Sequence, residues 1–154
     1  MTKTKSKPLQ LVAAGFIDDA EEYVESARQL VAIKGGTRRW SGPIYFLLGH
    51  AMELALKAYL AASGVSMGTL RRRIGHDLKL ALRRAQEHGY VPTDAFTELA
   101  QWLAPYHLDH FFRYRKGNGS HQLPAASEAA EIIADAINAI ERYVREKMCH
   151  QGAA

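Results

Sequence analysis

The sequence has almost no cysteine, since Cys149 is the single one among 154 residues. One thiol cannot close an internal disulfide, which excludes a disulfide-stabilised small domain and agrees with a reducing compartment. The surrounding residues, KMCHQGAA, are typical of a frayed tail. They provide no base held in a fixed position, so we do not expect a catalytic thiol.

Long uninterrupted apolar runs are also lacking. The most hydrophobic stretch, residues 45–64, is broken by His50, Glu53 and Lys57, so we do not expect it to span a bilayer. The basic start, MTKTKSKPLQ, is not followed by the apolar region and cleavage site of a signal peptide. We therefore expect a cytoplasmic protein with no membrane association.

No segment alternates apolar and polar residues over the length of a convincing β-strand. Apolar residues instead recur with the 3.6-residue period of helices, and glycine and proline mark the breaks. The predicted fold is all-α, an up-and-down bundle of four main helices plus short helical pieces. The expected helices cover residues 9–33, 41–63, 77–88, 94–104 and 127–147.

The chain has the length of one domain and shows neither repeats nor a dividing linker. We expect a flexible basic tail over residues 1–8, a single helical domain over 9–148 and a frayed tail over 149–154.

Positive charge exceeds negative charge by four, and it is concentrated in residues 71–89, where six Lys and Arg face Asp77 and Glu87. Such a segment is either a patch for phosphate or a solvated helix face. The absence of interleaved aromatic residues favours the solvated face. The candidates for RNA or phosphate contact are Arg71, Arg72, Arg73 and Lys116.

A narrow polar stripe runs along the expected helix 41–63, because His50, Glu53 and Lys57 follow one another at spacings of three and four. It is either a solvent edge with a favourable Glu–Lys pair or an internal polar network. A buried Glu53 would need partners, because an isolated carboxylate inside a protein is very costly. The candidate partners are Arg113, Arg115 and His76.

Residues 105–124 break the helical pattern with two prolines and two glycines, but they are rich in histidine and aromatic residues. A connection of this length in a compact domain tends to be functional. The histidines of HLDH (107–110) with His121 are loosely compatible with zinc. We favour histidines that pack on Phe111 and Tyr114, so we assign no metal and no cofactor.

The stretch HFFRYRKG (110–117) mixes aromatic and basic residues. This mixture suits stacking and phosphate contact on single-stranded RNA. It equally suits a loop that Phe111 and Phe112 anchor to the core, and the anchor is the favoured interpretation.

Two stretches together resemble the HEPN domain: GHAMELALKAYLAASG, and then IGHDLKLALRRAQEHG. The family has a histidine and a glutamate three residues apart on its second helix, and a His-Asp-Leu sequence that opens the next. The likeness covers about residues 10–147, with its specific part in 45–88. The matching positions are His50, Glu53, Leu54, Leu56 and Lys57, followed by His76, Asp77 and Leu78.

The resemblance implies two kinds of function. Many members are metal-independent endoribonucleases, often toxins paired with a nucleotidyltransferase-like antitoxin, and their mark is an Arg, four to six residues, and a His. Here Arg115, KGNGS and His121 match that spacing. Other members bind RNA or nucleotides, or act as non-catalytic scaffold modules. The nuclease site lies in a dimer cleft, so the resemblance implies a homodimer.

This chemistry fits the two candidate catalytic residues, Arg115 and His121. Attack by the RNA 2′-hydroxyl needs one proton removed there and one delivered to the leaving 5′-oxygen, and a histidine can take either role. An arginine stabilises the charge that grows on the phosphate. The expected supporting residues are His50, Glu53, His76, Asp77 and Arg113.

Overall fold

The computed structural model describes residues 8–34, 41–112 and 124–151. Within these ranges it contains six α-helices, one π-helical turn and no strands, so the predicted all-α class is confirmed. The elements are α1 (Leu9–Lys34), α2 (Ser41–Ala62), α3 (Met67–Thr69), the π-helical turn η2 (Leu70–Ile74), α4 (Leu78–Glu87), α5 (Asp94–Leu108) and α6 (Ala126–Gln151).

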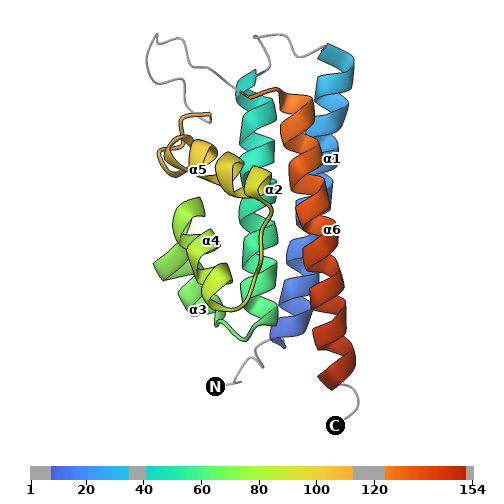
Figure 1. Cartoon of the computed structure of the whole chain (residues 1–154), viewed down its shortest axis with the longest axis vertical. Helices are drawn as coiled ribbons and strands as arrows, with labels where there is room; N and C mark the ends of the chain where they lie inside the picture. Colours follow the sequence, from blue (N-terminus) through green and yellow to red (C-terminus); the bar gives the residue numbers. More distant parts are fainter. Residues whose placement is uncertain (1–7, 35–40, 113–123, 152–154) are drawn as a thin grey trace, which may run out of the picture.

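The three longest helices, α1, α2 and α6, pack together side by side. The colours of Figure 1 show that α1 runs in the opposite direction to α2 and α6. The shorter helices α4 and α5 pack on each other and on α2, and α5 crosses α2 and also contacts α6 (Figure 1). Helix α2 is therefore central, which explains why it is apolar around most of its circumference.

The core is formed by the inward faces of these helices. Its largest fully buried side chains are Tyr45, Phe96, Ile44, Leu48, Met52, Leu56, Leu60, Leu70, Leu78, Leu103, Ile133 and Ile137. Many of them lie on α2. A polar side chain in the middle of α2 is therefore buried and needs a partner inside the protein.

The expected helix boundaries in the middle of the chain agree with the structure. Helix α2 ends where Gly64 adopts a φ of 93°, a left-handed conformation that glycine takes at little cost. The Asp77 side chain caps α4 by accepting from the Leu80 N–H at 3.0 Å. The Thr93 hydroxyl caps α5 by accepting from the Phe96 N–H at 3.1 Å.

Two helix ends were predicted too early: α6 continues to Gln151 instead of residue 147, and α5 continues beyond residue 104. The pattern predicted an end at residue 104 because Pro105 follows, but α5 continues through Pro105 to Leu108. Proline lacks the N–H that an α-helix uses, so the last turn needs support from elsewhere. Burial of Ala104 and His107 on both sides of Pro105 supplies it. The connection after α5 therefore begins later than predicted.

Among the described helices, α2 is long and apolar enough to cross a membrane by length and composition alone. Most of it is buried inside the protein, however, as expected of a core helix. This feature is weak evidence either way about a membrane.

Candidate functional site: a buried carboxylate among histidines

Glu53 lies in the middle of α2 and is only 2% exposed. Its Oε1 accepts a hydrogen bond from Lys57 Nζ at 2.6 Å. Its Oε2 lies 2.6 Å from His107 Nε2 and 2.9 Å from His76 Nδ1. The stripe on α2 is thus an internal polar network and not a solvent edge. Of the partners expected for Glu53, the structure brings His76 to it.

Three separate segments supply the side chains of this network. Glu53 and Lys57 come from α2, His76 from the turn between η2 and α4, and His107 from the last turn of α5. The network therefore ties α2 to the two shorter helices that pack against it.

Gly49 makes the approach of α5 to α2 possible. A Cβ added at Gly49 would lie 2.7 Å from His107 Nδ1, a distance that real Cβ atoms essentially never show. The missing side chain lets the His107 imidazole lie against the α2 backbone, one turn before Glu53.

Opposing effects act on the Glu53 carboxyl. Burial alone would raise its pKa, but hydrogen bonds from His107, Lys57 and His76 outweigh burial and hold the pKa at about 2. Glu53 is therefore a carboxylate at neutral pH. Lys57, which is also buried, lies against this carboxylate as its ion-pair partner.

His50 stands at the edge of the network. Its Nδ1 is 3.9 Å from Glu53 Oε2, and its ring packs edge-on against Tyr23 of α1 with centroids 4.5 Å apart. Burial lowers the pKa of His50, and the negative charge of Glu53 opposes that shift only in part. A neutral imidazole is therefore favoured there near neutral pH.

A small cavity of about 10 Å³ opens beside the network, and it is lined by Phe46, His50, His76, Tyr106, His107, His110 and Phe112. Four of the seven histidines of the chain thus surround a space that holds about one water molecule. The side chain of His76 is 46% exposed. The His110 ring lies edge-on to it with centroids 5.3 Å apart, on a backbone whose φ is 54°.

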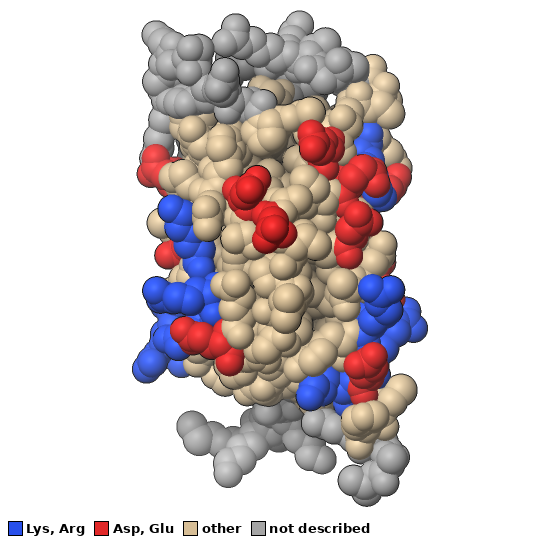
Figure 2. Space-filling model, viewed as in Figure 1, with Lys and Arg blue, Asp and Glu red and all other residues tan. Residues whose placement is uncertain are grey.

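An exposed basic face is formed by residues that flank His76 in the sequence. It consists of Arg71, Arg72 and Arg73 of η2 and of Lys79 and Arg83 of α4, and within the described part of the chain none of these five forms an ion pair. Figure 2 shows blue side chains gathered along the edge where α3 and α4 lie. This surplus of cations favours a polyanionic partner.

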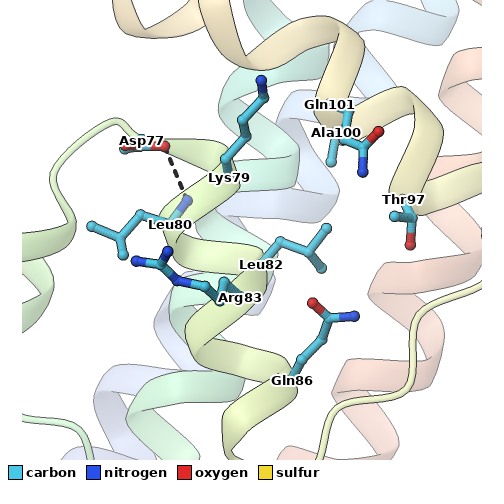
Figure 3. A pocket seen from close by; sticks show the side chains of 9 residues that line it. All are labelled: Asp77, Lys79, Leu80, Leu82, Arg83, Gln86, Thr97, Ala100 and Gln101. Atoms are coloured by element: carbon cyan, nitrogen blue, oxygen red, sulfur yellow. Dashed lines mark hydrogen bonds between the residues drawn. The ribbon is translucent and has the colours of Figure 1, made fainter.

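A groove of about 530 Å³ continues this face between α4 and α5 (Figure 3). Lys79, Arg83 and Gln86 line it from α4, while Thr97 and Gln101 line it from α5. Asp77 lies at the rim of the groove. There its carboxylate caps α4, a role distinct from the Glu53 network (Figure 3).

The candidate catalytic pair is not part of this geometry. Arg113, Arg115, Lys116 and His121 lie outside the described residues, as does any contact they make. In the sequence, Arg113 follows Phe112, the last described residue at the small cavity.

Sequence reasoning missed His107 as the main partner of Glu53, because Pro105 was taken to end the helix before it. The signal was present in the apolar spacing. Phe96, Ala100, Leu103 and His107 follow one another at steps of four, three and four, which continue a single buried helix face.

No protein-family model matches the chain, and no curated protein or solved structure matches it either. What the fold and the site define is a structural class. It is an all-α protein whose central helix carries a buried carboxylate bonded to a lysine and two histidines.

Proposed function

We propose that the chain is a HEPN-like protein that binds RNA and cleaves it as a metal-independent endoribonuclease. The proposal includes a HEPN-like up-and-down bundle of four main helices, a cytoplasmic homodimer and a nucleotidyltransferase-like antitoxin as its partner in a prokaryotic defence setting. Arg115 and His121 are its catalytic pair.

One observation carries the proposal: an oriented, exposed imidazole is flanked in the sequence by exposed cations that form no ion pair among the described residues. His76 Nδ1 is 2.9 Å from the Glu53 carboxylate, which fixes the ring and leaves Nε2 for another partner. Three exposed arginines, Arg71 to Arg73, precede His76, and Lys79 follows it. In this proposal these cations bind the phosphate backbone and His76 contacts it.

The reaction needs no metal ion. The RNA 2′-oxygen attacks the adjacent phosphorus as its proton leaves to a base, and the P–O5′ bond breaks as O5′ receives a proton. His121 serves one of these transfers, and Arg115 stabilises the charge on the phosphate oxygens. His76 contacts the phosphate and positions it.

A second candidate function is a non-catalytic binding or scaffold module that forms a homodimer. It is favoured by the completeness of the Glu53 network, whose two oxygens are both occupied by side chains of the protein itself. In that case the polar residues organise the bundle and perform no chemistry.

The two functions are separated by RNA cleavage in EDTA. Wild type and His121→Ala are incubated with single-stranded RNA, and cyclic-phosphate ends are measured. We expect cleavage by wild type and a loss of about 100-fold or more in the variant, the usual contribution of a general acid or base. His88→Ala, at the exposed end of α4, is the matched control and retains activity.

Well-folded wild type that leaves RNA intact, or cleavage that is equal in wild type and His121→Ala, removes the nuclease function. RNA binding by fluorescence anisotropy then tests the basic face. Arg72→Glu is expected to weaken binding and flatten its salt dependence, whereas Arg142→Glu on α6 leaves both unchanged. If both charge reversals have the same effect, the basic face has no role in RNA binding.

A further inference from the structure

We propose that His50, Glu53 and His107 bind one divalent first-row metal ion, with zinc as the natural occupant, and that this ion clamps α5 to α2. The site goes beyond the RNA-directed function, which needs no metal. It joins residues that are far apart in the sequence but converge in the fold.

The geometry of the three residues places their donor atoms around one point. The ligand atoms of His50, Glu53 and His107 all lie within 4.8 Å of one another. Glu53 Oε2 is 2.6 Å from His107 Nε2 and 3.9 Å from His50 Nδ1. Zinc bonds of about 2.0–2.2 Å place tetrahedral ligand atoms roughly 3.3–3.5 Å apart. Two of the observed distances lie on either side of that range and the third is no longer than 4.8 Å, so side-chain shifts of about 1 Å bring all three into coordination.

The donor set is one that first-row metals prefer. Two imidazole nitrogens and one carboxylate oxygen form a frequent three-ligand site, in which a fourth position stays open. In this proposal a water in the small cavity, which His76 and His110 also line, takes the fourth position.

The surroundings of Glu53 also suit a metal ligand. Lys57 Nζ holds Oε1 at 2.6 Å, which fixes the carboxylate plane and leaves Oε2 turned toward the histidines. Such an outer partner orients a ligand and tunes its basicity. The cavity lined by His50, His76 and His107, at about 10 Å³, has the size of a single ion or water.

Imidazole nitrogens are concentrated around the single oxygen Oε2. Those of His107 and His76 lie 2.6 and 2.9 Å from it and that of His50 lies 3.9 Å from it. His76 and His107 satisfy the hydrogen-bonding capacity of Oε2, whereas His50 is too distant for a hydrogen bond. A cation at the centre gives the nitrogens of His50 and His107 a ligand role.

Metal binding to the whole chain is measured directly, without any assay of RNA cleavage. Protein stripped with EDTA and dialysed is titrated with Zn²⁺ by calorimetry, and with Co²⁺ by visible absorption. We expect one equivalent per chain, a tetrahedral Co²⁺ spectrum, and a rise in Tm with Zn²⁺ because the ion binds only the folded state.

His50→Ala is the decisive variant, because His50 donates no hydrogen bond to Glu53 and its loss leaves the network in place. Loss of an outer partner lowers metal affinity by about 10–100-fold, and we expect the Zn²⁺ affinity of His50→Ala to fall by more than that. We also expect no Tm rise with Zn²⁺. His88→Ala and His150→Ala, outside the cluster, serve as controls and bind like wild type.

Absence of saturable one-to-one binding overturns the site. So does equal affinity in wild type and folded His50→Ala, or binding that disappears in His150→Ala, since the tail would then hold the ion.

Discussion

Tyr45 and Glu53 are both buried in α2, yet their polar atoms differ in how they are satisfied. Glu53 has partners on both oxygens. The Tyr45 hydroxyl has no hydrogen-bond partner within the described part of the chain, and burial raises its pKa to about 12. A buried unsatisfied hydroxyl costs stability, whereas the ring that carries it contributes apolar packing against Trp102 and Phe112.

The Tyr45→Phe variant keeps this ring and removes the hydroxyl. We expect the free energy of unfolding to stay the same or to rise by about 1 kcal/mol, because an unsatisfied group disappears without loss of packing. Urea unfolding at neutral pH measures it. A loss of more than about 1 kcal/mol would mean that the hydroxyl has a partner in the folded protein.

Alanine substitutions at two helical glycines are expected to change stability in opposite directions. In Gly49→Ala the new Cβ meets His107 Nδ1, so we expect destabilisation by about 1–3 kcal/mol. In Gly15→Ala nothing lies within 4 Å of the new Cβ, so helix propensity alone acts, and we expect stabilisation by about 0.5–1 kcal/mol. Thermal unfolding of both variants measures these changes. A gain in stability for Gly49→Ala would contradict the close approach of α5 to α2 at Gly49.

At the scale of helices, the starts and ends that depend on local chemistry were predictable from sequence. The cap at Asp77, the cap at Thr93 and the stop at Gly64 are side-chain or backbone effects within a few residues. The end of α5 was not predictable in this way. Its last turn is held by a contact between His107 and Glu53, 54 residues apart, and the sequence does not reveal which helix faces meet.

In the candidate site, too, local spacing was predictable from the sequence and the packing of helices was not. The i,i+3 and i,i+4 spacing on α2 placed His50, Glu53 and Lys57 on one stripe, as the structure shows. Whether that stripe faced solvent or the core depended on how α4 and α5 pack on α2, which periodicity does not fix. His76 was an expected partner of Glu53, whereas His107 required the continuation of α5 past Pro105.

The cap of α4 gives a prediction at this scale. Asp77→Ala removes the acceptor of the Leu80 N–H, so we expect a loss of about 1 kcal/mol in the free energy of unfolding. Asp77→Ser retains a capping oxygen and is expected to lose only a few tenths of that amount. Chemical denaturation compares the two. Equal losses would show that the charge of Asp77 matters and its cap does not.

For the whole molecule, the buried network makes stability depend on pH. The pKa of Glu53 is about 2 in the folded protein against 4.5 ordinarily, so the unfolded chain binds the proton more readily. The stabilisation is complete above about pH 4.5 and is lost as pH falls toward 2. The lowered pKa of His50 also makes the protein less stable as pH falls, and this loss begins near pH 6.5. The charged and titratable groups that face Glu53 are His50 and Lys57 of α2, His76 before α4, and His107 of α5.

We therefore expect the free energy of unfolding to fall from pH 7 to pH 3, with Glu53 contributing about 2 kcal/mol of the loss, because pH 3 still lies above its folded pKa of about 2. Urea unfolding in EDTA over this range measures it. In Glu53→Gln the curve should be flatter below pH 4.5, because that carboxyl no longer titrates. Parallel curves for the two proteins would contradict the depressed pKa.

The site, the metal proposal and the pH dependence all depend on one claim, which is that the Glu53 carboxylate joins α5 to α2. A double-mutant cycle of Glu53→Gln and His107→Ala, measured by urea unfolding in EDTA at neutral pH, tests it most directly. We predict that the two single losses overlap, with a coupling energy of about 1–3 kcal/mol. Losses that add to within about 0.5 kcal/mol would show that the two side chains do not interact in the folded protein.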